Sequence, residues 1–354
     1  MQPDADELRL CGIRQGRLLA GPETLQINLT NACNLDCVFC WNHSALRPNP
    51  SDAWHRQRLS PAHLENILAA LPRLAPSRVL LSGRGEPLLH PGIRDLLATL
   101  RDHAIPTAIQ TNGSTGPGPD ELAALGVDHL LVNVSAATEA GWAATHPTRA
   151  RLHAVVLERL EQLAQLHTPA VTLVAVIQRS NHQELLPLWE LALRVKARGL
   201  QLKGLEPQPG LEPLRLDAGQ TERVRADLHR VTQRAAQAGL ELRAEHLQRL
   251  LDRDSARFSR ELSHGPCYMG WYHLRVTCDG RVMFCCKDKL VDHLDRRPLY
   301  AIWRSAAYHL LRLSARDGDL DGPFDDKCGG CSNFQRNHEI ARDVGEHTES
   351  GGWS

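Results

Sequence analysis

The chain has 354 residues, of which 42% are hydrophobic and 23% are charged, and its 41 Lys and Arg residues equal its 41 Asp and Glu residues. This balance excludes a strong net field that would draw the protein to nucleic acid or to an anionic membrane. The start MQPDADELRL has no basic, apolar leader, and no apolar run reaches the ~20 residues of a membrane span, which predicts a cytoplasmic protein without a membrane partner.

Short β-rich segments alternate with helical patterns through the first two thirds of the chain. Ser60 and Pro61 form a helix start, and Asn181 with Glu184 predicts a capping box for a helix that stops at Gly199. This alternation predicts an α/β fold with a parallel sheet, as a partial (β/α)6 TIM-like barrel or as a doubly wound sheet. The predicted strands are 24–30, 78–83, 106–111, 129–135, 171–178 and 200–205.

The domain organisation follows from changes of composition along the chain. An N-terminal extension (1–23) precedes the barrel (24–206), and 207–263 is predicted to be a charged, amphipathic helical linker. The segment 264–335 is rich in Gly, Cys and aromatic residues, has a hairpin dipeptide at Asp279-Gly280, and is predicted to need a metal to fold. Residues 336–354 are predicted to form a polar tail.

The first cysteine group follows the first predicted strand. Cys33, Cys37 and Cys40 have C-x3-C-x2-C spacing, so one loop can bring three thiolates to one metal centre. A 4Fe-4S cluster ordinarily takes four cysteines, so three leave one iron open to another ligand. The alternative is a zinc site in which Asp36 or His43 supplies the fourth ligand.

Polar groups stand at the ends of the other predicted strands, where parallel α/β barrels build their sites. Asn112 also fits a purely local turn, and Asn181 fits a purely local helix cap. The residues in question are Gly83, Gly85, Glu86, Asn112, Ser135, Gln178, Asn181, Leu205 and Glu206.

The second cysteine group lies in the C-terminal segment. Cys267, Cys285, Cys328 and Cys331 supply four thiolates, with Cys286 as an alternative to Cys285, and a four-cysteine zinc ribbon is the competing interpretation. Cys11, Cys278 and Cys286 are left without a metal, and the favoured interpretation of each is a small buried hydrophobic residue.

The first cysteine motif, with Phe39 directly before its third cysteine, resembles the signature of the radical S-adenosylmethionine (SAM) superfamily. The sequence SGRGE resembles the Gly-Gly-Glu motif of that family, with Arg84 in place of the middle glycine. The resemblance implies a 4Fe-4S cluster that binds SAM, with the methionyl ammonium held by Glu86 and the glycine backbone. It also implies that Ser135 and Gln178 or Asn181 contact the SAM carboxylate and ribose, that Asn112 lies beside the site, and that the backbone at Leu205 borders the adenine.

The C-terminal segment resembles the SPASM/Twitch auxiliary-cluster region of that superfamily. Because no cysteine follows Cys331, the shorter Twitch form with one auxiliary 4Fe-4S cluster fits better, which gives two clusters in total. Cys286 and Cys278 are candidates to donate a hydrogen atom to a substrate radical, as in epimerising members of the family.

These resemblances imply an enzyme that reductively cleaves SAM to a 5'-deoxyadenosyl radical, which abstracts hydrogen from a substrate. Only about two dozen residues precede the first strand, too few for a leader-binding module, so we expect dehydrogenation or epimerisation of a sugar or aminocyclitol-like molecule. The alternatives are peptide or protein modification, as in ribosomal peptide maturation, and a non-catalytic two-cluster electron carrier or zinc-bound scaffold.

The expected partners are a small-molecule or peptide substrate and an electron donor such as flavodoxin or ferredoxin. Several polar side chains are candidates to bind substrate or to accept a proton, and Glu206 is counted among the catalytic candidates. The set is Arg179, Lys203, Glu206, Tyr268 and His273.

Overall fold

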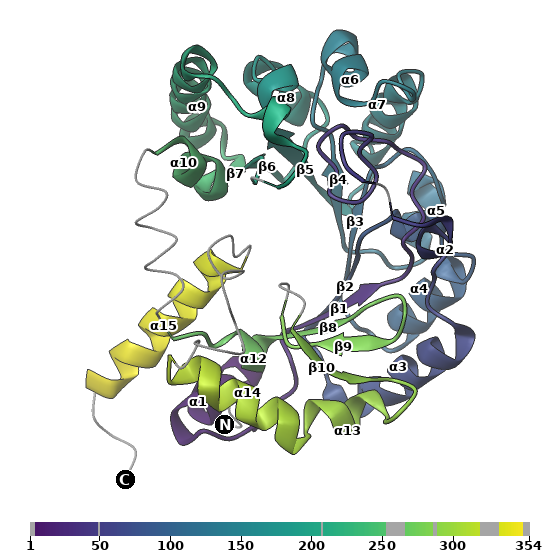
Figure 1. Ribbon diagram of the computed structural model, residues 1–354, viewed down its shortest axis with the longest axis vertical. Coiled ribbons are helices and arrows are strands. Elements are labelled where there is room, and N and C mark those ends of the chain that lie inside the picture. The colour runs from purple at the N-terminus through teal and green to yellow at the C-terminus, as the bar shows by residue number, and fades with distance from the viewer. Residues whose placement is uncertain are drawn as a thin grey trace. The chain divides into compact units, whose positions relative to one another are not determined.

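The computed structural model describes residues 4–48, 50–206, 208–252, 266–285, 289–318 and 333–349. Their contacts divide the chain into two compact units, each assembled from segments that are distant in the sequence (Figure 1). The first unit comprises Met1–Asn28, Arg58–Leu80 and Ala256–Ser354, and the second comprises Leu29–Gln57 and Leu81–Ser255. The two cysteine groups therefore fall in different units.

The second unit contains five parallel strands in the order β3-β4-β5-β6-β7. The first four confirm predicted strands, and their apolar side chains are buried on the sheet. The strands are β3 (Thr107–Thr111), β4 (His129–Asn133), β5 (Ala170–Ile177), β6 (Gly199–Gly204) and β7 (Glu241–Arg243).

Helices alternate with these strands and pack on the sheet, as the sequence pattern predicts (Figure 1). They are α2 (Asp52–His55), α4 (Ile93–Asp102), α5 (Pro119–Ala124), α6 (Glu139–Thr145), α7 (Leu152–Leu163), α8 (Leu185–Arg194), α9 (Ala218–Ala238) and α10 (Glu245–Leu251). Three short 3-10 turns also lie in the part of this unit that the structure describes: η1 (Pro87–Leu89), η2 (Arg179–Asn181) and η3 (Glu212–Leu214).

Two expectations for this unit were wrong in detail. Helix α8 begins after Glu184 without a side-chain cap. It ends at Arg194, because Lys196 adopts a positive φ of 51° that a helix does not permit. Gly199, the predicted helix stop, is instead the first residue of β6. The predicted linker contains β7, which pairs in parallel with β6. Three residues of alternating polarity are too short to predict a strand from sequence.

The first unit has the strand order β10-β9-β8-β1-β2. Strand β8 pairs in parallel with β1, whereas β8–β9 and β9–β10 are antiparallel. The predicted hairpin at Asp279-Gly280 is confirmed, and Gly280 has the positive φ of 84° that its turn requires. The strands are β1 (Thr24–Asn28), β2 (Arg78–Ser82, whose last two residues belong to the second unit), β8 (His273–Val276), β9 (Arg281–Met283) and β10 (Leu290–His293).

The described residues of the first unit form six helices. Helix α3 begins as predicted, because the Ser60 hydroxyl accepts the His63 N–H and Pro61 occupies the first turn. The helices are α1 (Ala5–Gln15), α3 (Pro61–Leu74), α12 (Met269–Tyr272), α13 (Leu299–Trp303), α14 (Ala306–Arg316) and α15 (Phe334–Glu349).

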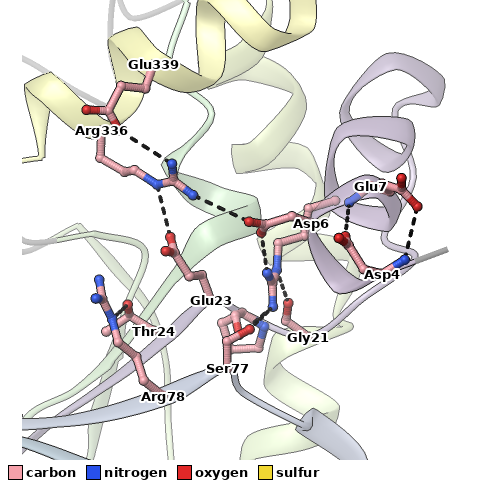
Figure 2. Close-up of polar contacts among 12 residues, drawn as sticks. Asp4, Asp6, Glu7, Gly21, Glu23, Thr24, Ser77, Arg78, Arg336 and Glu339 are labelled. Atoms are coloured by element: carbon pink, nitrogen blue, oxygen red, sulfur yellow. Dashed lines mark hydrogen bonds and ion pairs between the residues drawn. The ribbon is translucent and has the colours of Figure 1, made fainter. Parts of the chain in front are cut away.

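Helix α15 replaces the polar tail that the sequence predicts. Its apolar residues are few, but Ile340 is 1% exposed within a core cluster that α1 and α12 share. Arg336 on α15 forms ion pairs with Asp6 at 3.8 Å and Glu23 at 3.2 Å, as Figure 2 shows. A narrow apolar stripe and these ion pairs stabilise α15, whereas its mostly polar composition led us to predict a tail without a helix.

None of the helices within the described ranges combines the length and the apolar character that crossing a bilayer requires.

Candidate metal centre

The first cysteine motif forms a loop in the second unit that backbone hydrogen bonds hold in place. The Cys40 N–H donates to the Cys37 carbonyl at 2.9 Å, and the Val38 N–H donates to the carbonyl of Thr145 at 3.0 Å. The Asn42 N–H points at the sulfur of Cys40, 3.4 Å away. These hydrogen bonds fix the backbone of the cysteine loop.

The segment after β2 contacts the cysteine loop so closely that only glycine fits. A Cβ atom on Gly85 would lie 2.2 Å from the carbonyl oxygen of Ala32, and the Glu86 N–H donates to the same oxygen at 2.8 Å. Gly83 has a φ of 151°, which side-chain-bearing residues rarely adopt. The close approach requires glycine at 85, the backbone conformation favours glycine at 83, and Arg84 between them prevents neither.

The carboxylate of Glu86 is 2% exposed and accepts three hydrogen bonds within the second unit. One oxygen accepts from the Leu88 N–H at 3.0 Å and the Thr111 hydroxyl at 2.8 Å, and the other accepts from the Asn112 N–H at 2.7 Å. Burial raises the pKa of Glu86 to about 7, although these donors act in the opposite direction. Glu86 thus ties the end of β2 to the end of β3, and its contact with the SAM ammonium stays a prediction.

Asn112 extends this connection to the cysteine loop. Its side-chain amide donates to Asn34 at 2.9 Å and lies 4.0 Å from the sulfur of Cys33, while its oxygen accepts from the N–H of Ser114. Asn112 therefore serves the local turn and also contacts the cysteine loop, and its place beside bound SAM stays a prediction.

The polar residues at the ends of β4 and β5 are engaged with each other. Asn181 accepts the Gln178 N–H at 2.8 Å and donates to the Ser135 carbonyl at 2.6 Å, so it does not cap α8 as predicted. The Ser135 hydroxyl accepts from the Val176 N–H at 3.2 Å, and the Gln178 side chain caps Ser180. Their contacts with SAM stay predictions.

At the end of β6, Glu206 pairs with His246, and the sequence analysis identified only Glu206 as a candidate. The Leu205 N–H continues the ladder to the Ile177 carbonyl, and the next residue, Glu206, accepts from His246 Nε2 at 3.3 Å. His246 Nδ1 accepts the Gly204 N–H at 3.2 Å, so the proton of a neutral ring must be on Nε2. His246 lies on α10, forty residues later, and no sequence signal connects it to Glu206.

The three thiols of the loop have raised pKa values, so they resist ionisation unless a cation lies beside them. Burial raises the pKa of Cys33 to about 12, and burial together with the neighbouring Cys40 and Cys33 sulfurs raises the pKa of Cys37. Three partly buried thiols this close together become thiolates only beside a compensating cation, as iron would provide. The donor set therefore fits an iron-sulfur cluster.

The geometry disfavours the alternative of a single zinc ion. Zn–S bonds of ~2.3 Å would hold the ligand atoms of a tetrahedral site within about 4 Å of one another. In the described loop, no three donor atoms of His, Cys, Asp or Glu residues lie within 4.8 Å of one another. Asp36 instead accepts from the Thr148 hydroxyl at 2.6 Å, and His43 donates to the Arg84 carbonyl at 3.0 Å.

Phe39, before the third cysteine, contacts the edge of the His146 ring, with 6.2 Å between ring centroids. This places Phe39 as a support of the loop, and its contact with cofactor stays a prediction.

The C-terminal cysteines are only partly described. Cys285 is buried directly after β9, Cys278 is buried in the β8–β9 turn, and Cys267 is partly buried before α12. Cys286, Cys328 and Cys331 lie outside the described residues. The assignment of the second set of ligands, and of Cys286 or Cys278 as a hydrogen donor, stays a prediction.

The remaining substrate candidates are divided between the two units. Arg179 donates to the Arg215 carbonyl at 3.1 Å, and Lys203 lies within β6. Tyr268 and His273 are buried in the first unit.

Comparison with known proteins identifies both regions. Residues 27–192 match the radical SAM superfamily, and residues 267–332 match an iron-sulfur cluster-binding domain, SPASM. These two matches define an iron-sulfur protein that binds SAM. The chain belongs to the radical SAM superfamily and carries a C-terminal SPASM-type domain, so its cofactors are a SAM-binding 4Fe-4S cluster, an auxiliary cluster and SAM.

Two curated relatives illustrate the range of similar proteins. The PqqA peptide cyclase of Streptomyces rochei is 27% identical over 302 residues, which cover 80% of this chain and 76% of that protein. The probable GTP 3',8-cyclase of Pyrococcus abyssi is 27% identical over 174 residues, which cover 49% of this chain and 54% of that protein. The chain thus spans about half the length of the second relative.

Solved structures share the fold. SuiB of Streptococcus suis bound to SAM has a TM-score of 0.62 at 16% identity, and the match covers 85% of this chain and 70% of that one. The SAM-bound structure of anSMEcpe has a TM-score of 0.58 at 14% identity, with 91% and 98% covered. The fold is therefore α/β, with the partial barrel of radical SAM proteins rather than a doubly wound sheet.

Proposed function

We propose that this radical SAM enzyme modifies a peptide or protein substrate. The observation that carries the proposal is the match to the PqqA peptide cyclase, which extends over 80% of the chain and three quarters of that relative. The proposal is supported by a SuiB structure bound to its precursor peptide SuiA, whose fold matches that of this chain with a TM-score of 0.61. These relatives favour the peptide alternative over the sugar or aminocyclitol substrate that the sequence led us to expect.

We assign Cys33, Cys37 and Cys40 to the SAM-binding cluster. The auxiliary cluster is assigned to Cys267, Cys285, Cys328 and Cys331. When bound, the reduced cluster and SAM supply a 5'-deoxyadenosyl radical that takes a hydrogen atom from substrate, with electrons from a donor of the flavodoxin or ferredoxin type.

The residues of the second unit position this chemistry. Gly85, Glu86 and Asn112 hold the cysteine loop against the ends of β2 and β3. The Glu206–His246 pair offers a carboxylate at the end of β6 that can accept a proton from substrate, with His246 orienting it. Trp41, on the loop, is 45% exposed and Leu46 is 44% exposed, so large apolar side chains beside the cysteines are available to a peptide.

The test is anaerobic reconstitution followed by analysis of iron, acid-labile sulfide and 5'-deoxyadenosine. We expect about eight irons in the wild type and about four in a Cys33/Cys37/Cys40→Ala triple variant, since each cubane cluster holds four. Cys11→Ala, which changes a cysteine outside both groups, is the control and should retain all irons. Deoxyadenosine should form only with the intact loop.

The substrate class is tested by adding peptides encoded beside the gene, aminocyclitol glycosides and GTP in separate reactions. A peptide should increase deoxyadenosine formation and change its own mass, and with a deuterated peptide the deuterium should appear in deoxyadenosine. Stimulation by a glycoside or by GTP alone would contradict the proposed substrate class while leaving the radical mechanism intact.

A further inference from the structure

Outside the cysteine groups, the first unit contains a cluster of two histidines and one aspartate. His63 lies in the first turn of α3, His293 ends β10, and Asp295 lies in the turn that leads to α13. One donor atom from each of these residues lies within 4.8 Å of the other two. No cysteine takes part, so this cluster is separate from the predicted iron-sulfur ligands.

The Asp295 carboxylate lies between the two imidazole rings. Its Oδ1 atom is 2.7 Å from Nε2 of His63, and its Oδ2 atom is 3.3 Å from Nδ1 of His293. The ring centroids are 5.8 Å apart with an interplanar angle of 71°, so the rings flank the carboxylate without stacking on each other. Three electron-pair donors from three separate elements therefore converge.

One contact in this cluster would be satisfied by a proton or a metal ion. The Asp295 N–H donates to Nδ1 of His293 at 3.2 Å, which requires an unprotonated Nδ1 whose lone pair faces the same residue. The carboxylate oxygen at 3.3 Å is also an acceptor, and two acceptors repel each other unless a proton or a metal ion lies between them. The donor set of two imidazoles and one carboxylate is one that Zn²⁺ prefers.

Neighbouring contacts fix the positions of the three donors. Asn66, one turn after His63 on α3, donates to the Leu294 carbonyl at 3.3 Å and accepts the Leu299 N–H at 2.9 Å. These two contacts bracket Asp295 in the sequence, so the carboxylate and the His63 ring are held from the same helix. A Cβ on Gly280 would lie 2.5 Å from the His63 ring, so the hairpin turn closes the other side.

The site is open to solvent on one side. The His63 and His293 side chains are 14% and 26% exposed, whereas Asp295 is 70% exposed. Protein ligands thus occupy the inner positions, and water can occupy the outer ones, as in zinc sites with three protein ligands.

We propose that His63, His293 and Asp295 bind one Zn²⁺ ion, with water completing its coordination. Ni²⁺ and Cu²⁺ bind the same donor types, and imidazole nitrogen gives all three ions an advantage over Mg²⁺ or Ca²⁺. The bound ion cross-links α3 to the turn between β10 and α13 and stabilises the first unit. This site is independent of the proposed substrate.

The experiment uses the anaerobically reconstituted protein, with both clusters loaded and adventitious metal removed by a chelator. Calorimetric titration with ZnCl2 should show one site, and X-ray absorption at the zinc edge should show nitrogen and oxygen neighbours only. The melting temperature should rise with micromolar Zn²⁺. Iron measured before and after the titration should be unchanged.

Variants separate the proposed site from nonspecific binding. His293→Ala and Asp295→Asn should abolish the site and the thermal shift, and Asn66→Ala, which only loosens the ligands, should weaken affinity by about 10- to 100-fold. His309→Ala on α14 and Asp292→Asn on β10 are the controls and should bind like the wild type. Retained iron and circular dichroism show that each variant folds.

Equal zinc binding by the wild type and Asp295→Asn would overturn the proposal, and so would sulfur neighbours in the absorption spectrum, which would place the zinc at cysteines. Absence of binding would also overturn it and would leave the Asp295 carboxylate hydrogen-bonded to His63.

Discussion

The two cysteine groups that are predicted to bind clusters differ in how the fold positions them. In the second unit, three cysteines fall within eight residues, and the loop that holds them is fixed by contacts with Ala32, Thr145 and the residues after β2 and β3. In the first unit, the described members of the predicted set lie near the ends of separate elements, with Cys267 before α12 and Cys285 after β9. The first arrangement is local and shaped by backbone, whereas the second depends on the packing of separate elements.

Among the substitutions considered, Gly85→Ala should most strongly affect one cysteine group while leaving the other intact. In Gly85→Ala, the new Cβ would lie 2.2 Å from the Ala32 carbonyl, so the cysteine loop must move away. We expect loss of the SAM-binding cluster and retention of the auxiliary one, measured as half of the wild-type iron and no deoxyadenosine. Gly118→Ala, where no atom lies within 4 Å of the new Cβ, is the matched control. Full iron content in Gly85→Ala would show that the contact does not shape the loop.

Substituting Arg312 tests the packing of the first unit. Arg312 is 1% exposed and donates to the carbonyls of Gly270 and Trp303, each at 2.8 Å. Its guanidinium lies 4.0 Å from the ring centroid of Tyr308, and although burial lowers its pKa to about 10 it stays charged at neutral pH. Arg312→Met leaves two buried carbonyls unpaired and should cost about 2–4 kcal/mol of unfolding free energy.

Anaerobic urea unfolding, followed by near-UV circular dichroism, measures this loss. The exposed Arg94→Met in the second unit is the control, for which we expect no change. A wild-type midpoint in Arg312→Met would mean that the packing of the first unit does not depend on this cation.

His146 tests the loop region through pH. Burial lowers the pKa of His146 to about 4, from an ordinary value near 6.5, and its ring stacks on Trp142 with centroids 4.0 Å apart. Because the unfolded chain binds the proton more readily, the stabilisation is complete above pH 6.5 and is lost as pH falls toward 4. The loss at pH 5 should be about 2 kcal/mol.

His146→Gln removes this titration, so its unfolding free energy should fall less than that of the wild type between pH 7 and pH 5. Parallel urea titrations at several pH values give the comparison. An identical pH dependence in both proteins would show that His146 is protonated in the folded state as readily as in the unfolded one.

The smallest effect is expected at Asp36. Its carboxylate binds Thr148 rather than joining the cysteine donors, so Asp36→Ala should retain the wild-type iron content of the loop cluster. Metal analysis and the visible absorption of the reconstituted protein provide the measurement. Loss of metal would restore the four-ligand alternative with Asp36 as the fourth ligand.

The sequence by itself determined the features that depend on neighbouring residues. The cysteine spacing, the six strand segments, the Ser60 cap and the Asp279-Gly280 hairpin all follow from patterns a few residues long. Local sterics and periodic burial control such features, and both depend on residues that are close together in the sequence.

Only the tertiary structure decided the pairing of residues that are distant in the sequence. It joined His246 to Glu206, placed β8 beside β1, and brought His63 to His293 and Asp295 across more than two hundred residues. It also gave Asn181 a partner in Ser135 and made α15 a helix through one buried isoleucine and the ion pairs of Arg336. These contacts depend on how whole elements pack, and packing energy is a property of the assembled chain that no short window of sequence contains.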